Sequence, residues 1–519
     1  MLGRYRSGLM LARGMAALAL GLFALPAASN PAGHVQRSVR LLQEGDLKGA
    51  EAAARLAVRD PATEAVAYAL LGSIRLRQEK FAEGADLLEL AVEADPSLVG
   101  ARLNLAQAYA LIGRNASSTE QLRAVLRLAP DNENARTALF RAESQAGNHR
   151  EALELAKPIE PRLRASPDGL LHLARSYAEV GDTAGARSLV GDWSNLQGVP
   201  RDWTVKFALT LSGGGLNRVA IDILEELTKE GLASFDVAFN LGGLYLLESE
   251  LEEASASYEL ALRFDDQSLP ALRQVARIAE ERGELEKALS FLIRAKLEAP
   301  EDPEVLFSFG RVALRLDLIE DATAALRKTL ALSPEHRAAR YWLGTAHGAA
   351  RNLDAALEQY ELLLEHRPTD PQLHYAVGSV HFLKVDFENA TRHLRESCRL
   401  DPDQLLSPYY LASIAQKKGN NEEAIGMYAE IVARHPDHAP SYEGLAISQS
   451  RLRQYDEARR NFETAIRLDP DSARANYQLG QLLVRMGLRE EAMKQLEVAR
   501  DLREEEEESQ IVKTLLNPH

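Results

Sequence analysis

Three kinds of residue recur along this 519-residue chain at intervals of 34 positions. One series of prolines, at positions 96, 130, 300, 334, 368, 402, 436 and 470, is spaced by 34 residues or a multiple of 34. A second series holds alanine at every thirty-fourth position from Ala152 to Ala492. A third series, twelve residues before the second, holds mostly glycine or alanine, as at Gly344. Because the three series keep register with one another, the sequence indicates one structural unit repeated about fourteen times.

The repeated unit has the pattern of two helices. Between Asp437 and Pro470, apolar residues at helical spacing flank the polar stretch 451–456, which predicts an antiparallel helix pair joined by a short turn. Small residues let the two backbones approach closely, and the proline ends the second helix because it lacks the helical N–H. Alanine, leucine, arginine and glutamate dominate the composition, which favours helices over sheets. Glycines recur at the inter-helix turn, where a left-handed residue commonly ends a helix, at positions 113, 147, 181, 215, 283, 419 and 487.

The 34-residue period, together with the residue types at its recurring positions (slots), resembles the tetratricopeptide repeat (TPR) over residues 31–506. Tyr109, Tyr177 and Tyr245 fill the tyrosine slot three residues after the Gly/Ala position, whereas His347 and His381 depart from it. The resemblance implies an all-α, right-handed superhelical solenoid of about fourteen antiparallel helix pairs. We expect the structural anchors of the repeat to include Gly344, Ala356, Pro368, Gly378, Ala390, Pro402, Ala424, Pro436, Ala458 and Pro470.

The N-terminus has the basic, apolar and small-residue order of a secretory signal peptide. Three arginines precede the apolar run 15–25, which is too short to span a bilayer comfortably, and Ala27 and Ser29 follow it. We expect cleavage after Ser29 and a periplasmic or secreted location; an uncleaved helix or a misassigned start is the alternative. The expected organisation is 1–29 signal peptide, 31–166 repeats one to four, 167–234 degenerate repeats five and six with a bend as one interpretation, 235–506 repeats seven to fourteen, and 507–519 a C-terminal cap or tail.

No catalytic motif is found in the sequence, and we expect neither enzymatic activity nor a cofactor. Phosphate-cradling and dinucleotide-binding glycine motifs are absent, and Gly213–Gly215 is interpreted as a flexible turn. Cys398 is the only cysteine, so the chain can form no internal disulfide and no thiolate zinc site. A formal net charge of −15 disfavours nucleic-acid binding. Histidines cluster after residue 336, but their proximity alone does not predict a metal site.

The best candidate for a binding surface is the inner face that TPR proteins form from their first helices. One slot, three residues before the Gly/Ala position, is repeatedly aromatic, and a slot four residues later holds arginine. These residues would form a groove for a peptide, with arginine holding a carboxylate. The alternative is that the aromatics only pack between repeats and that Arg277 pairs with Glu281. The candidate ligand-binding residues are Arg277, Phe307, Arg311, Tyr341, Tyr375 and Tyr409.

The sequence therefore predicts a non-enzymatic scaffold that binds other proteins or peptides on its concave surface. It predicts no nucleic-acid partner, no small-molecule cofactor, and contact with a membrane only through a partner. The alternative function is a substrate-presenting or accessory subunit of an envelope secretion, polysaccharide-export or glycosyltransferase complex. Long TPR arrays in protein O-glycosyltransferases carry a separate nucleotide-sugar domain, which we do not expect here because the repeats leave only about 13 residues after 506.

Overall fold

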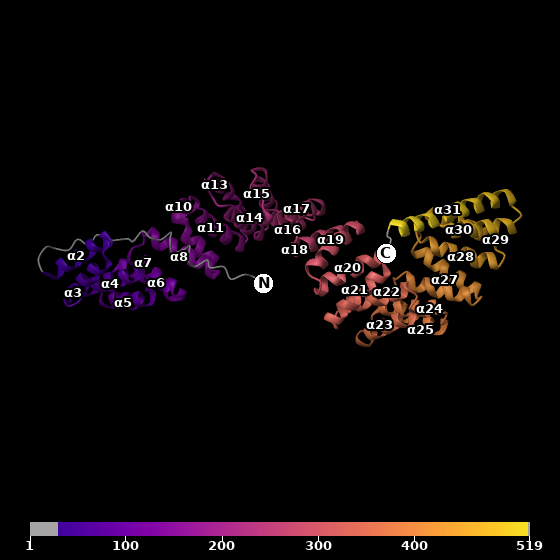
Figure 1. The fold of residues 1–519 in the computed structure, drawn as a ribbon, viewed down its shortest axis with the longest axis horizontal. Coiled ribbons are helices and arrows are strands. Elements are labelled where there is room, and N and C mark those ends of the chain that lie inside the picture. Colours follow the sequence, from indigo (N-terminus) through magenta and orange to yellow (C-terminus); the bar gives the residue numbers. More distant parts are fainter. Residues whose placement is uncertain (1–29, 517–519) are drawn as a thin grey trace. The chain divides into compact units, whose positions relative to one another are not determined.

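The computed structural model describes the backbone of residues 30–516 and the side chains of residues 32–503 (Figure 1). Helices make up the secondary structure of this part of the chain, which contains no strand. The helices divide into two compact units, one up to Asp266 and one from Gln267. Within residues 30–516, none of the helices has the length and apolar character that crossing a bilayer would require. The expected signal peptide, 1–29, lies outside the described residues and stays a prediction.

The first unit consists of helix pairs in which each helix packs on its partner and on the next pair. The pairs keep the predicted register, because Ala152, Ala186 and Ala220 are all buried at the contact between their two helices. The helices are α2 (Asn30–Glu44), α3 (Leu47–Ala57), α4 (Glu64–Arg77), α5 (Phe81–Ala94), α6 (Val99–Leu111), α7 (Asn115–Leu128), α8 (Glu133–Ala146), α9 (His149–Ala156), η1 (Lys157–Ile159), α10 (Glu160–Arg164), α11 (Pro167–Glu179), α12 (Thr183–Ser188), α13 (Val190–Asn195), α14 (Arg201–Gly213), α15 (Asn217–Lys229), α16 (Phe235–Leu247) and α17 (Leu251–Phe264).

The region expected to hold degenerate repeats is where helices of this unit are broken. Helix α9 ends at Ala156, immediately before the turn of 3₁₀ helix that contains Pro158, and α10 follows as a separate short helix. Proline cannot donate the helical N–H, so a continuous helix is disfavoured at this position. Further on, the second helix of its pair is divided into α12 and α13, and the Trp193 ring stacks on Phe207 with 4.1 Å between centroids. The bend and the domain boundaries proposed above stay predictions.

The second unit repeats the same pair more regularly. Its last helix, α31, continues through the glutamate run to Leu516, and the C-terminal cap or tail stays a prediction. The helices are α18 (Leu269–Glu281), α19 (Leu285–Glu298), α20 (Pro303–Arg315), α21 (Ile319–Leu332), α22 (Arg337–Ala349), α23 (Leu353–His366), α24 (Pro371–Leu383), α25 (Phe387–Leu400), α26 (Leu406–Lys417), α27 (Asn421–Arg434), α28 (Ala439–Arg451), α29 (Tyr455–Leu468), α30 (Ala473–Arg485) and α31 (Arg489–Leu516).

Small residues hold the two helices of each pair close together. A Cβ atom added to Gly344 would lie 2.7 Å from a ring carbon of Tyr360, and one added to Gly378 would lie 2.8 Å from Leu394. Contacts this short leave room only for hydrogen, which explains the glycine of the third series. The alanines of the second series face the same contact and are fully buried at Ala356, Ala390, Ala424 and Ala458.

The predicted helix ends are also present. The second helices end two residues before Pro368, Pro402, Pro436 and Pro470. The predicted turn glycines all have positive φ, between 77° and 87°. Six other residues at the same slot, one repeat or more apart, share this left-handed conformation although they are not glycine: Glu79, Ser249, Asp317, Arg351, Val385 and Arg453. The turn geometry is therefore imposed by the packing of each pair rather than by glycine itself.

Candidate functional site

The four aromatic residues of the candidate groove lie on successive first helices of the second unit. Phe307 lies on α20, Tyr341 on α22, Tyr375 on α24 and Tyr409 on α26, each three residues before the small residue of its helix. Phe307 is only 8% exposed, whereas the three tyrosines are half-buried. Burial raises the pKa of Tyr341, Tyr375 and Tyr409. Each residue thus keeps only part of its ring available to a partner.

Each of these rings contacts another ring of its own or the next repeat. The centroid distances are 4.7 Å from Phe307 to His336 and 5.5 Å from Tyr341 to Tyr360. Tyr409 lies 5.4 Å from His438, in an edge-to-face arrangement. Among the described residues, none of the four rings stacks on the next one along the array. Packing within and between repeats therefore accounts for much of the regular spacing of this slot, and direct binding by these rings stays a prediction.

The two candidate arginines form ion pairs within the protein. Arg311 lies 2.7 Å from Glu280 of the preceding first helix, and its guanidinium lies 5.2 Å from the centre of the Phe307 ring. Arg277 is 3.6 Å from Glu281, one turn away on its own helix, and its side chain is 52% exposed. Arg277 thus forms the pair with Glu281 that the alternative interpretation expected, and its part in binding stays a prediction. Exposed pairs of this kind contribute little stability, so Arg277 is the freer of the two to meet a partner.

The structure adds a group of aromatic residues that slot-by-slot reasoning missed. We call Tyr375, Phe382, Tyr409 and Tyr410 the aromatic cluster. Tyr410 lies at its centre, 6.0 Å from Tyr375, 4.9 Å from Phe382 and 5.7 Å from Tyr409 between ring centroids. The ammonium of Lys417 lies 5.5 Å from the centre of the Phe382 ring, which is a cation–π contact. The spacing of seven residues from Tyr375 to Phe382, two helical turns, was the available sequence signal.

All four members of the aromatic cluster are partly exposed, and Lys417 is exposed. Partly exposed aromatic rings offer a large contact area at a small cost in side-chain entropy. The ammonium beside them can form an ion pair with a carboxylate. The arrangement is therefore suited to binding a protein segment that carries apolar and acidic side chains, and it contains no group placed for covalent chemistry.

Three histidines lie close together on the α24–α25 helix pair. The Nδ1 atoms of His374 and His393 lie 3.1 Å apart, and the ring of His381 stacks on His393 with 6.0 Å between centroids. His374 donates its Nε2–H to the carbonyl oxygen of Pro368 at 3.0 Å, because that oxygen can only accept. Burial lowers the pKa of His393 to about 4, and the nearby charges of His374, Arg392 and His381 act in the same direction. The contact between the two Nδ1 atoms can therefore hold only one proton.

In the first unit, a histidine lies between a serine and an aspartate, as in the triad of a hydrolase. Nδ1 of His172 lies 3.4 Å from the hydroxyl of Ser144, and Nε2 lies 3.7 Å from Asp168. Both distances are longer than the hydrogen bonds of working triads. Ser144 is 0% exposed and accepts a hydrogen bond from Ser176 at 3.1 Å. A substrate could not reach this hydroxyl, so the cluster is interpreted as a buried hydrogen-bond network.

Within the part of the chain whose side chains are described, no set of three or more histidine, cysteine, aspartate or glutamate residues is arranged to hold a metal ion. His347 is buried in the tyrosine slot, and His438 bonds the hydroxyl of Ser441 at 2.7 Å. These two histidines therefore occupy the packing and helix-start positions that the repeat provides.

Family models described as tetratricopeptide repeat match much of the chain. One model matches residues 69–133, 205–268, 307–371 and 343–404, a second matches 409–438, and a third matches 451–516.

Several curated proteins are similar to the chain at low identity. BBSome complex member BBS4 of Bos taurus is 24% identical over 54% of this chain and 54% of its own length. TPR repeat-containing protein YpiA of Bacillus subtilis is 23% identical over 67% of this chain and 90% of its own. The CTR9 homologue of Arabidopsis thaliana is 22% identical over 47% of this chain and 26% of its own. The chain thus spans about half the length of the BBS4 relative that it matches.

Solved structures with a similar fold include YrrB, described as a TPR protein with an unusual peptide-binding site. It has a TM-score of 0.33 and 22% identity, and the match covers 36% of this chain and 96% of YrrB. A tetratricopeptide repeat protein from Parabacteroides merdae has a TM-score of 0.42 and 15% identity over 51% of this chain and 98% of its own. The anaphase-promoting-complex hetero-tetramer Cut9–Hcn1 has a TM-score of 0.40 and 14% identity, and the match covers 92% of this chain and 94% of the Cut9–Hcn1 chain.

Proposed function

Because the chain belongs to the tetratricopeptide-repeat family, we propose that it is a non-enzymatic scaffold of the periplasm or the secreted space, which binds partner proteins or peptide segments on the first-helix face of its second unit. TPR arrays serve protein–protein interaction, because stacked repeats present a long, continuous surface. The finer parts of the proposal are the binding face and the cellular location, and each has its own support and its own test.

The aromatic cluster is the observation that carries the binding face. Tyr375 and Phe382 lie two turns apart on one side of α24, and Tyr410 and Lys417 lie two turns apart on α26. Tyr410 touches the rings of both Tyr375 and Phe382, so the two helices present one aromatic surface. Contact hot spots are enriched in tyrosine, and a well-placed anchor often contributes at least about 1–2 kcal/mol to binding.

Reversing the charge of Lys417 tests this face without removing any ring from the packing. Lys417→Glu replaces the ammonium beside Phe382 with a carboxylate. Lys418→Glu is the matched control, because Lys418 is the adjacent residue, is also exposed, and lies at the same end of α26. Both changes put an acid at a helix C-terminus, so both carry the same small penalty from the helix dipole.

The measurement is quantitative affinity purification with mass spectrometry from the envelope and secreted fractions. We expect a set of proteins that the wild type and Lys418→Glu retain equally and that Lys417→Glu loses by about tenfold or more. Equal retention by all three forms would place the binding surface elsewhere.

The cellular location rests on the basic, apolar and small-residue order of residues 1–29. N-terminal sequencing of the protein from cell fractions checks it. We expect the mature chain to begin near Asn30 and to leave the cytosol. Intact Met1 in the cytosolic fraction would contradict export.

A further inference from the structure

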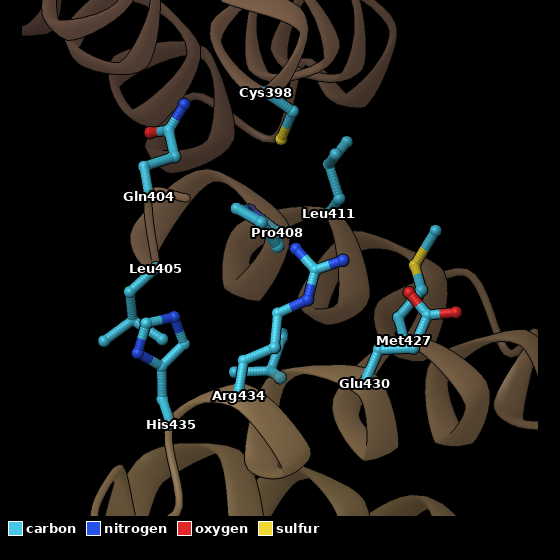
Figure 2. Close-up of a pocket in the computed structure, with 10 residues that line it drawn as sticks. Cys398, Gln404, Leu405, Pro408, Leu411, Met427, Glu430, Arg434 and His435 are labelled. Atoms are coloured by element: carbon cyan, nitrogen blue, oxygen red, sulfur yellow. The ribbon is translucent and has the colours of Figure 1, made fainter. Parts of the chain in front are cut away.

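A cavity of about 160 Å³ opens between α25, α26 and α27 (Figure 2). Its walls are mainly apolar, and we call it the α25–α27 socket. Cys398 of α25 and Leu405 of the connecting turn contribute to its lining, and the helices α26 and α27 supply most of the rest. The socket is lined by Cys398, Leu405, Pro408, Leu411, Met427 and Ile431, with charged residues beside them.

The repeat explains why the socket occurs at this place. At the slot of Cys398, most other repeats carry a branched aliphatic residue, which packs in a hydrophobic cluster. A cysteine side chain is shorter than leucine, and the packing atoms that leucine would supply are missing here. Burial also raises the pKa of the Cys398 thiol, so it stays neutral and behaves as a small apolar group. The aliphatic residues at this slot are Val58, Val92, Leu126, Leu262, Leu330, Leu364, Val432 and Ile466.

The socket lies on a different face of α26 from the aromatic cluster. Leu411 follows Tyr409 by two residues, which is a rotation of about 200° around the helix. A ligand in the socket would therefore leave the aromatic cluster free. This makes the socket a second site, distinct from the proposed binding face.

The rim of the socket carries a cation. Arg434 is exposed, and its guanidinium extends toward Pro408 in Figure 2. Its Nη1 donates to the carbonyl oxygen of Pro402 at 3.3 Å. Among the described residues, Arg434 forms an ion pair with no carboxylate, although Glu430 lies one turn earlier on the same helix. The charge of Arg434 is thus available to an anion at the mouth.

We propose that the α25–α27 socket binds one apolar side chain of a partner protein, of the size of leucine or phenylalanine, and that Arg434 binds a carboxylate beside it on the partner. The volume supports the first part, since an apolar protein cavity of about 150 Å³ is large enough to hold benzene. The unpaired guanidinium supports the second part, because arginine binds carboxylates through charge-assisted hydrogen bonds. The occupant is therefore an apolar residue next to an acidic residue or a chain terminus.

The test uses N-acetyl-L-phenylalanine, which combines the ring with a carboxylate. Cys398 is the only cysteine of the full chain, so its rate of modification by a thiol reagent reports on the socket. We expect millimolar N-acetyl-L-phenylalanine to slow this modification severalfold, and its uncharged amide to protect less. In Arg434→Gln, the acid and the amide should protect equally. Absence of protection by either compound would overturn the proposal.

Two variants of Cys398 complete the test, with binding followed by ligand-observed NMR. Cys398→Leu fills the socket with the residue that Leu364 provides one repeat earlier, so the fold should persist and probe binding should be lost. Cys398→Ala keeps the space open and should bind like the wild type. Equal binding by Cys398→Leu, with circular dichroism confirming an intact fold, would show that the probe binds elsewhere.

Decanoate distinguishes a peptide from a lipid, because it also joins an apolar chain to a carboxylate. Binding of decanoate more than about tenfold tighter than N-acetyl-L-phenylalanine would make a lipid chain the occupant and overturn the peptide proposal. Lys417→Glu should leave binding of both probes unchanged. A failure of the socket therefore does not bear on the proposed function, and the reverse also holds.

Discussion

We predict that mild acid loosens the α24–α25 helix pair. His393 is half-buried, and its pKa lies near 4 because burial, and then the charges of His374, Arg392 and His381, disfavour its protonated form. The carboxylate of Asp386 lies 3.1 Å from Nδ1 of His381 and contacts that ring rather than His393. With its Nδ1 3.1 Å from that of His374, a second proton between the rings has no acceptor.

The size of the effect follows from the difference between the two states. An unfolded histidine has a pKa near 6.5, so between about pH 6.5 and 4 the unfolded segment binds a proton that the folded pair does not. The free energy of unfolding therefore falls as the pH falls through this window, and His393 causes no further loss below pH 4. A pKa shift of about 2.5 units lowers the free energy of unfolding by at most about 3.4 kcal/mol. Because solvent screens a half-exposed ring, we expect about 1–2 kcal/mol.

The assay is amide hydrogen exchange of residues 371–400, compared between wild type and His393→Gln at each pH. Glutamine can still bond His374 but does not titrate, so the comparison removes the pH dependence of intrinsic exchange. Opening in a repeat array is nearly local, so the difference should concentrate in α24 and α25. His366→Gln is the control, because His366 is exposed and bonds only the carbonyl of Leu362. Identical pH profiles for wild type and His393→Gln would refute the reasoning.

Two further predictions concern the repeat itself. Ala356→Arg should lower the free energy of unfolding by a few kcal/mol, because Ala356 is fully buried at the contact between α22 and α23. Hydrogen exchange should rise in the repeats adjoining 337–370. Ala349→Arg, at an exposed position of α22, is the control and should leave exchange unchanged. Unchanged protection in Ala356→Arg would show that the helical frame is wrong. Val385→Gly should raise stability by about 0.5–1 kcal/mol, because Val385 has φ of 61° and is 67% exposed, so that relief of strain exceeds the entropy cost of glycine. Thermal unfolding checks this, and a lower melting temperature for Val385→Gly than for wild type would contradict it.

The helix pairs could be predicted from the sequence because each repeat solves the same local packing problem. Gly344 and Ala356 are both small because two helices approach closely there. The same contact occurs in each pair, so small residues recur in the sequence every 34 positions. The left-handed turns at Val385 and Arg453 could not be predicted, since neither residue favours that conformation. Here the packing of the pair determines the backbone, and propensity is overridden.

The candidate site could be predicted less well, because its contacts run between repeats and between slots. The sequence placed Arg311 near Phe307 correctly, but Glu280, which lies 31 residues earlier, pairs with it across the array. Tyr410 could not be predicted from the 34-residue spacing of the aromatic slot, because it lies one residue outside that slot. Cys398 looked like an isolated thiol until the structure showed the space that its short side chain leaves open.

Site-specific photocrosslinking tests the central claim, that the first-helix face of the second unit binds protein partners. Leu383 on the first helix α24 and Leu332 on the second helix α21 are both 41% exposed, so a photoreactive residue at either position is equally available to solvent. We predict crosslinks to a discrete set of partner proteins from position 383 and few or none from position 332. Equal crosslinking at both positions, or crosslinking confined to position 332, would contradict the account.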